Sequence, residues 1–278
     1  MTGTHPTSGQ PAWVRLERDG PVATVTLCRP DVLNAQTPAM WSVLREYGRQ
    51  LSGEIRVVVV RGEGRAFSAG LDLSMSTAAV ASAPGGEATG GTAGESDTGG
   101  FEALAALPPE RAQERIAGYQ EAFSWLRRSD LVTIAAVQGH AIGAGFQLAL
   151  ACDLRVCADD AQFTMAEVTL GLVPDLGGTK RLVDLVGYAR ALEICVTGRR
   201  VAAAEAQRLG LANLVVPRAE LDGAVHDLTA AVLAGPRDAV VEVKALLAAA
   251  GDRGYPAQEA AEREAQVRRI RDLAGVGE

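Results

Sequence analysis

The stretch Gly139-His140-Ala141-Ile142-Gly143-Ala144-Gly145 lies between a β-branched run that ends at Val137 and an apolar segment that continues to Ala151. Its glycines allow a ligand to approach the main chain closely. If the apolar segment is a helix, its first N–H groups have no acceptor inside the helix, and the positive end of the helix dipole lies beside them. The stretch therefore predicts a strand that turns into a helix and presents backbone N–H groups to a ligand.

Another glycine-containing stretch, Gly64-Arg65-Ala66-Phe67-Ser68-Ala69-Gly70-Leu71-Asp72-Leu73, comes earlier in the chain and follows a β-branched run over residues 56–60. In chain order, this is the first glycine stretch, and Gly139 to Gly145 is the second. Two N–H donors that converge on one oxygen, one from each stretch, would form an oxyanion hole. Loss of one such donor costs about 3–4 kcal/mol of transition-state stabilisation. Either stretch alone is more typical of a tight turn, and neither has the Gly-x-x-x-x-Gly-Lys-Ser/Thr order of a phosphate-binding loop.

Strands alternate with helices around these two stretches. β-Branched and alternating segments predict strands at residues 13–16, 22–27, 56–60, 134–137 and 154–157. Apolar residues at helical spacing predict helices at residues 37–51 and 110–128, and another that ends at Ala151. This alternation implies βαβ units and an α/β fold. The pattern then becomes helical, with helices expected at residues 189–197, 202–209, 221–234, 239–249 and 257–273.

Composition restricts the class of partner. The formal net charge of −7 lacks the basic excess typical of proteins that bind nucleic acid. An anionic small ligand remains compatible, because backbone N–H groups and a few cations can hold phosphates. The four cysteines have no zinc or disulfide spacing, and with only three histidines a metal centre is not expected.

Two segments differ from the rest of the chain. Residues 1–11 predict a disordered arm without the basic and apolar regions of a signal peptide. Because no apolar run is long enough to span a membrane, we expect a soluble, cytoplasmic protein with no membrane partner. Residues 81–100 are rich in small residues and predict a mobile loop inside a flexible insertion at about 75–100. This loop either has no function or forms a lid over an acyl pocket.

Several blocks, in a fixed order, resemble the enoyl-CoA hydratase/isomerase (crotonase-like) family. They are Arg29-Pro30 with Asn34-Ala35, Ala66-Phe67-Ser68-Ala69-Gly70-Leu71-Asp72, the stretch from Gly139 to Gly145, Leu170-Gly171-Leu172-Val173-Pro174-Asp175-Leu176-Gly177-Gly178-Thr179, Val196-Thr197-Gly198, and residues 202–211. The resemblance covers about residues 22–217. It implies a crotonase-like spiral of ββα units over residues 12–200, and a C-terminal helical trimerisation region over residues 201–278. It also implies an acyl-CoA or enoyl-CoA substrate, a homotrimer or dimer of trimers, no metal, and no cofactor, since CoA is part of the substrate.

The resemblance also assigns site residues. It places the backbone N–H groups of Leu71 and Ala144 in the oxyanion hole, although glycine is more usual at the second position. Glu167 matches one of the two catalytic glutamates of the family's hydratases, and Asp175 stands where some isomerase branches have a proton-transferring aspartate. The substrate- and CoA-binding residues that it implies are Val32, Leu33, Ala69, Gly70, Asp72, Gly143 and Gln147. From the residues alone, a helix or loop cap is the preferred interpretation of Glu167, and a Pro-Asp turn is that of Asp175.

Gln147 is the main departure from the family's pattern, because it occupies the place of the second glutamate. An amide can orient a water or a carbonyl, but it does not take up a proton usefully near neutral pH. The preferred function is therefore enoyl-CoA isomerisation, with Glu167 and Asp175 moving the proton. The alternatives are an enoyl-CoA hydratase, in which Glu167 acts on a water that Gln147 orients, and a non-catalytic acyl-CoA-binding protein.

Overall fold

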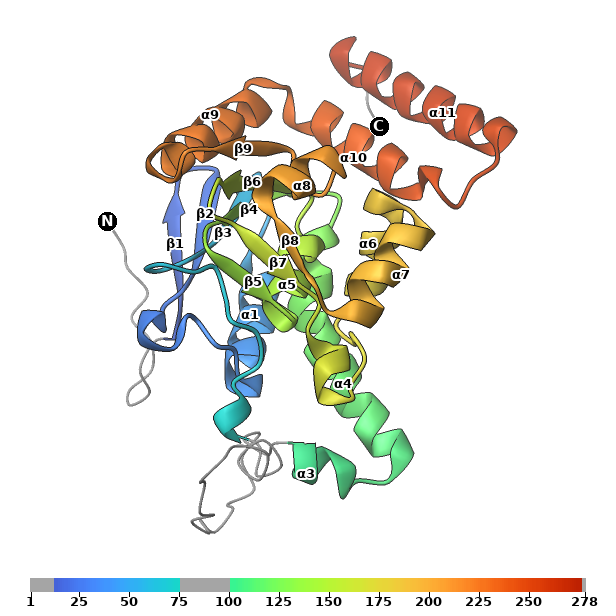
Figure 1. The fold of residues 1–278 in the computed structure, drawn as a ribbon. Helices are drawn as coiled ribbons and strands as arrows, with labels where there is room; N and C mark the ends of the chain where they lie inside the picture. Colours follow the sequence, from blue (N-terminus) through green and yellow to red (C-terminus); the bar gives the residue numbers. More distant parts are fainter. Residues whose placement is uncertain (1–12, 76–100, 277–278) are drawn as a thin grey trace, which may run out of the picture.

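The structure is a computed structural model that describes residues 13–75 and 101–276. The predicted disordered arm (residues 1–11) and nearly all of the predicted flexible insertion (residues 75–100) lie outside the described residues. An α/β core carries a pair of helices at its C-terminal end (Figure 1). The predicted fold class is thus confirmed.

A six-stranded sheet with the order β1-β2-β3-β4-β6-β9 forms the centre of the core. Its strands are β1 (Val14–Asp19), β2 (Val22–Leu27), β3 (Val57–Gly62), β4 (Val132–Val137), β6 (Leu154–Ala158) and β9 (Leu214–Val216). β1 pairs antiparallel with β2, and all later neighbours are parallel. Parallel neighbours require crossover connections, which the predicted alternation of strands and helices supplies.

Helices cover both faces of this sheet. They are α1 (Pro38–Gln50) and α4 (Pro109–Ser124) on one face and α9 (Leu221–Ala234) on the other. The run of valines in β3 explains this arrangement, because successive side chains of a strand point to opposite faces. Val58 and Val60 are buried in the cluster that includes α1 and α4, whereas Val57 and Val59 pack in the cluster that includes α9.

A smaller sheet, β5-β7-β8, contains the second glycine stretch. Its strands are β5 (His140–Ile142), β7 (Gln162–Thr164) and β8 (Arg200–Ala202). Helix α5 (Ala144–Ala151) begins two residues after β5, so the predicted turn from a strand into a helix is confirmed. Strands of three residues, including β9, were not predicted because they are too short to show a period of two.

The remaining helices are α3 (Phe101–Ala105), α6 (Gly178–Val186), α7 (Tyr188–Thr197), α8 (Ala203–Arg208), α10 (Arg237–Ala250) and α11 (Tyr255–Leu273), with 3₁₀ turns at Pro30–Val32, Leu73–Met75, Trp125–Arg127, Glu167–Leu170 and Arg218–Glu220. Of these helices, α7, α8, α10 and α11 match predicted ranges, whereas no range was predicted for α3 and α6. The predicted helical region, residues 201–278, is not entirely helical, and it begins with the last two residues of β8. It also contains β9, which extends the six-stranded sheet beside β6.

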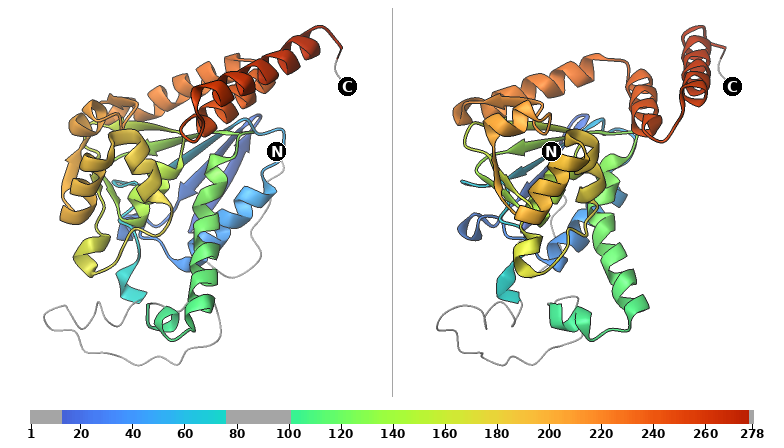
Figure 2. Two further views of the ribbon diagram at one scale, coloured as in Figure 1. Left: turned by 90° about the vertical axis from the view of Figure 1, so that its right-hand side faces the viewer. Right: turned by 45° about the vertical axis from the view of Figure 1, so that its right-hand side comes forward.

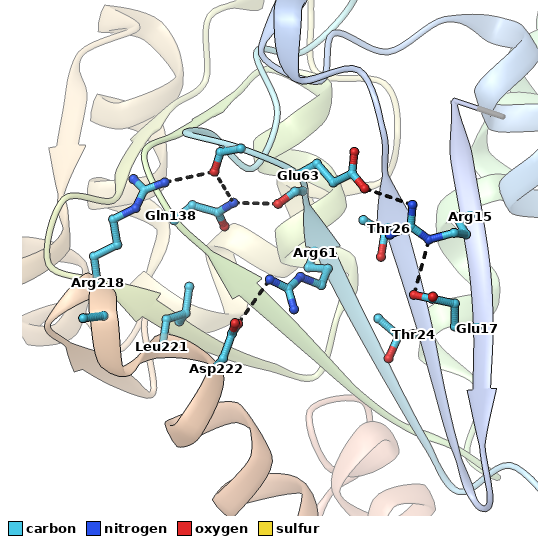
Figure 3. Close-up of a pocket in the computed structure, with 13 residues that line it drawn as sticks. Arg15, Glu17, Thr24, Thr26, Arg61, Glu63, Gln138, Arg218, Leu221 and Asp222 are labelled. Carbon is cyan, nitrogen blue, oxygen red and sulfur yellow. Dashed lines mark hydrogen bonds and ion pairs between the residues drawn. The ribbon is translucent and has the colours of Figure 1, made fainter. Parts of the chain in front are cut away.

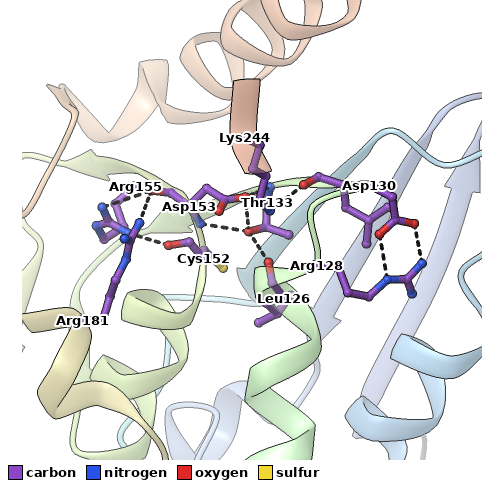
Figure 4. Close-up of polar contacts among 10 residues, drawn as sticks. Leu126, Arg128, Asp130, Thr133, Cys152, Asp153, Arg155, Arg181 and Lys244 are labelled. Carbon is purple, nitrogen blue, oxygen red and sulfur yellow. Dashed lines mark hydrogen bonds and ion pairs between the residues drawn. The ribbon is translucent and has the colours of Figure 1, made fainter. Parts of the chain in front are cut away.

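The C-terminal pair α10 and α11 projects beyond the core (Figure 2). Lys244 of α10 ties the pair to it, because its ammonium group donates to the carbonyl of Leu131 (2.6 Å) and pairs with Asp153 (2.7 Å). The same Asp153 oxygen accepts from the backbone N–H and the hydroxyl of Thr133 at the start of β4 (Figure 4). Within residues 13–75 and 101–276, no helix has the length and apolar character needed to cross a membrane.

Candidate active site

The two glycine stretches lie side by side in the structure. Ser68 forms a parallel bridge with Ala141 of β5, and its backbone exchanges hydrogen bonds with His140 O (2.9 Å) and Ile142 N (3.0 Å). Gly70 makes the closest approach, since a Cβ there would lie 2.5 Å from Ile142 O and 3.5 Å from Ala144 N. Gly70 also has a φ of +87°, which disfavours other residues. The predicted convergence of these stretches is therefore present.

Neither of the two predicted oxyanion-hole donors has a hydrogen-bond acceptor in the described part of the chain. Among the residues that the structure describes, the N–H groups of Leu71 and Ala144 donate no hydrogen bond. Ala144 is the first residue of α5, so its N–H has no acceptor within the helix. Leu71 is held on both sides, because Gly70 O accepts from Gln36 N (2.6 Å) and Asp72 N donates to Gln36 O (2.8 Å). Their catalytic role remains a prediction.

A buried polar cluster supports the first stretch, and none of its members was predicted as a site residue. Gln36 donates to Ser68 Oγ (3.0 Å) and accepts from Trp41 Nε1 (2.8 Å). Ser68 Oγ in turn donates to Asn34 O (2.8 Å). Such side-chain bonds order the backbone that carries Leu71. In the sequence, the signal for this cluster was the pair of polar residues Asn34 and Gln36 next to an apolar helix. Such a pair is by itself typical of many loops.

The predicted CoA-binding residues near the N-terminus surround a strained turn. Leu33 and Asn34 both have left-handed backbone conformations, with φ of 54° and 56°, which asparagine tolerates better than leucine. Leu33 O accepts from Ala69 N (2.8 Å), so this turn and the first glycine stretch are joined. Val32 is 45% exposed and open to a ligand.

Asp72 is bonded within the chain, where a contact with CoA was predicted. Its carboxylate pairs with Arg29 (2.9 Å) and accepts from the Ser74 hydroxyl (2.6 Å). Burial alone would raise the pKa of Asp72, but the bonds from Ser74 and Arg29 outweigh it and hold the pKa below its ordinary value. A carboxylate bonded in this way stabilises its own loop. A CoA ligand could bind Asp72 only alongside Arg29 and Ser74.

Glu167 faces the second glycine stretch from the turn after β7. A Cβ on Gly143 would lie 3.3 Å from Glu167 Oε1, which also accepts from Gln147 Nε2 (2.7 Å). Glu167 Oε2 is buried and has no hydrogen-bond partner among the described residues. Burial raises the pKa of Glu167, and the negative charge of Asp175 raises it further, while the bond from Gln147 opposes both. Such a carboxyl group is suited to exchange a proton.

Asp175 lies within electrostatic reach of Glu167 on the segment that leads into α6. Burial raises its pKa as well. Its backbone carbonyl accepts from Gln120 of α4 (2.6 Å), and the next residue, Leu176, donates its N–H to Gln147 (2.9 Å). The structure thus places Glu167 beside Gly143 and within electrostatic reach of Asp175, while the catalytic roles of both carboxyl groups remain predictions. It places Gln147 between the two carboxyl-bearing segments.

A separate polar cavity of about 600 Å³ lies between β1–β3 and the start of α9 (Figure 3). None of the predicted site residues lines it. Its charges are paired across the cavity, with Arg15 bound to Glu63 (2.9 Å) and Arg61 to Asp222 (3.2 Å). We therefore do not assign the substrate to this cavity. No group of acidic, cysteine or histidine side chains within the described part of the chain could hold a metal ion.

Comparison with known proteins places these features in a family. The family model for enoyl-CoA hydratase/isomerase matches residues 99–273. Carnitinyl-CoA dehydratase of Salmonella enteritidis PT4 is 38% identical over 219 residues, covering 77% of this chain and 72% of that protein. A structure from Thermobifida fusca YX, assigned as an enoyl-CoA hydratase and solved in complex with CoA, has a TM-score of 0.84 and 47% identity over 95% of each chain. The enoyl-CoA hydratase of Polaromonas sp. JS666 has a TM-score of 0.78 and 30% identity, covering 94% of this chain and 93% of that one.

The spiral of two sheets, with two glycine stretches meeting at the start of α5, defines a crotonase-like protein. The chain belongs to the enoyl-CoA hydratase/isomerase family. The family and the crotonase-like fold predicted from the sequence are both confirmed. Trimer formation by the C-terminal helices remains a prediction.

Proposed function

We propose that this protein acts on an enoyl-CoA thioester and stabilises its enolate between the N–H groups of Leu71 and Ala144. The observation that carries this proposal is the arrangement of two donors without acceptors beside the half-buried carboxyl group of Glu167, whose Oε2 atom is buried. Donors aimed at developing negative charge stabilise a transition state most strongly in a site that excludes water. Related structures that contain CoA and acetoacetyl-CoA support a CoA thioester as the ligand. No cofactor is needed for this chemistry.

The preferred reaction is migration of a double bond. Glu167 removes a proton from the carbon next to the thioester carbonyl of a 3-enoyl-CoA, and the electron pair passes to the thioester oxygen. Asp175 then delivers a proton to the far carbon, giving the conjugated 2-enoyl-CoA. Two carboxyl groups whose pKa values are raised by burial favour this scheme, since each is a better base than an exposed carboxylate.

Reversible hydration is the second candidate, and the similarity to carnitinyl-CoA dehydratase favours it. Glu167 would then exchange a proton with water without help from a second glutamate, because position 147 carries an amide. The orientation of this water by the carbonyl of Gln147 is less favoured, because that oxygen already accepts from Leu176 N (2.9 Å) and Gly178 N (3.2 Å).

One pair of assays distinguishes the candidates. With a 3-enoyl-CoA, an isomerase increases the absorbance of the conjugated thioester; with a 2-enoyl-CoA, a hydratase decreases it. Glu167→Gln should lower either rate by at least about 100-fold while acyl-CoA binding persists. Unchanged turnover in this variant would remove Glu167 from the mechanism. Binding of acyl-CoA with neither absorbance change would favour a binding protein without catalysis.

We further propose that α10 and α11 join copies of the chain into a homotrimer or a dimer of trimers. None of the α10 residues is buried in the single chain, and Ala265 is the one buried residue of α11. Val243 and Leu247 of α10 are 54% and 70% exposed. A helical pair that leaves such residues uncovered is well suited to an interface between copies.

A further inference from the structure

We infer that Gln147 is a positioning residue that selects the reactive oxygen of Glu167 and holds the Asp175 segment in register with it. This inference rests on the proposed function. It concerns how one neutral side chain orders two carboxyl groups that lie on either side of it.

The orientation of the Gln147 amide is determined by its partners. Backbone N–H groups are donors only, so the atom that faces Leu176 N (2.9 Å) and Gly178 N (3.2 Å) must be the amide oxygen. The amide nitrogen is therefore directed away from that segment. It donates to Glu167 Oε1 over 2.7 Å.

The Gln147 side chain is closely packed against the segment that it binds. Gln147 is 1% exposed and lies in α5, between the turn that carries Glu167 and the start of α6. A Cβ on Gly178 would lie 2.7 Å from Gln147 Cγ, so the absence of a side chain at Gly178 is what allows the amide to reach both N–H groups. The side chain is thus a rigid bridge between two segments of the site.

This bridge makes the two oxygens of Glu167 unequal. Oε1 is occupied by the Gln147 amide, whereas Oε2 is buried without a partner among the described residues. Oε2 is therefore the oxygen that is free to receive or deliver a proton. Because Leu176 is held by the other end of the same amide, a shift of Gln147 would also move the neighbouring Asp175.

A carboxylate at position 147 could keep the two bonds from Leu176 and Gly178 but could not donate to Glu167 while it is ionised. It would instead place like charges in contact, and one of the two would retain its proton to higher pH. The other titratable groups that face Glu167 are Asp175 on the following segment and Cys195 on α7. Arg127 lies beside the same segment, near Gly177.

The test compares the full-length wild type with Q147E, E167Q and the exchanged double variant Q147E/E167Q. Turnover of 3-hexenoyl-CoA or 2-hexenoyl-CoA, whichever the wild type converts, is followed from pH 5 to 9 together with Tm. For Q147E we expect kcat at pH 7 to fall at least about tenfold with KM within about threefold. The ratio of kcat at pH 6 to kcat at pH 8 should fall at least about threefold, because Glu167 stays protonated to higher pH.

The double variant separates positioning from mere packing. It restores an amide–carboxylate hydrogen bond with its direction reversed, so Tm should return toward that of the wild type. Turnover should remain at least about 100-fold reduced, because the carboxylate is now on α5 and no longer at position 167. If Q147E does not fold, Q147M serves in its place, with the same expected loss of kcat and retained KM.

Two outcomes would overturn the inference. One is a Q147E enzyme, or Q147M in its place, with the wild-type kcat and pH profile; the other is recovery of wild-type turnover by Q147E/E167Q. Both are distinct from failure of the proposed function. That failure would appear as full turnover by E167Q alone, whatever the variants at position 147 show.

Discussion

At the scale of single residues, the site depends on groups that are held in unfavourable states. Glu167 is half-buried with one buried oxygen unpartnered among the described residues, and Leu33 and Asn34 have left-handed backbone conformations. Such arrangements cost free energy and persist only because surrounding contacts compensate for them. Stability and activity should therefore oppose one another at these positions.

Glu167→Gln should make the protein more stable relative to the wild type as the pH rises. Burial raises the pKa of Glu167 in the folded state, so its contribution to stability is fully present below the unfolded-state pKa and is lost as the pH rises through the folded-state pKa. Glutamine removes this ionisation but can still accept from Gln147. The Tm difference, variant minus wild type, measured between pH 4 and 8 should increase with pH. A constant difference would contradict the burial of an ionisable group here.

Gly70→Ala should lower kcat by about 10²–10³-fold. The added methyl group would lie 2.5 Å from Ile142 O, so the Leu71 N–H must move away from the Ala144 N–H. The matched control is Gly223→Ala in α9, where a Cβ meets no atom within 4 Å. The control should keep full activity and gain about 0.5–1 kcal/mol in stability. Equal activity of both variants would argue against an oxyanion hole at Leu71.

At the scale of elements, the attachment of α10 to the core depends on one polar cluster. Lys244 is 12% exposed at its side chain and bonds to the Leu131 carbonyl and to Asp153. Asp153 also receives two bonds from Thr133 of β4, so the ion pair connects α10 directly to the central sheet (Figure 4).

Lys244→Met should lower the free energy of unfolding by about 2–3 kcal/mol, because it leaves a charge-assisted bond unmade next to a half-buried carboxylate. Chemical denaturation measures this change. Lys180→Met is the control, since Lys180 pairs with Asp184 on the exposed surface of α6 (2.6 Å) and its loss should leave stability unchanged. An equal effect of the two substitutions would show that the Lys244 contacts do not anchor α10.

At the scale of the whole molecule, the core buries its apolar side chains within one chain, whereas the C-terminal pair of helices does not. The six-stranded sheet has helices on both faces, whereas α10 and α11 project beyond the core (Figure 2). These two helices expose several large apolar side chains. They are Val243, Leu247, Tyr255, Val267, Ile270 and Leu273. We expect a second copy of the chain to cover them.

Leu247→Asp should convert the assembly into smaller species, because it places a charge in an apolar interface. Light scattering coupled to size-exclusion chromatography should give the mass of three or six chains for the wild type and a lower mass for the variant. Arg111→Asp on the exposed surface of α4 is the control and should leave the mass unchanged. A monomeric wild type would refute the proposed assembly.

Local patterns in the sequence were sufficient to predict the class of fold and the two glycine stretches. Strand β3 and the helices from α7 to α11 were predictable from the sequence. A β-branched run, or apolar residues at helical spacing, can be recognised within a few neighbouring residues. Resemblance of short blocks then indicated the family, and it named Glu167, Asp175 and the donors of Leu71 and Ala144.

Only the tertiary structure decided how these groups meet. Gln147 and Glu167 are 20 residues apart in the chain, and Gln147 and Leu176 are 29 apart, yet one amide bonds to both. The strands β7, β8 and β9 are likewise defined by their partners, because three residues carry too little periodicity to predict a strand. Hydrogen-bond direction and burial depend on contacts between distant segments, so no local pattern could have shown that Gln147 binds Glu167 and leaves only its second oxygen free.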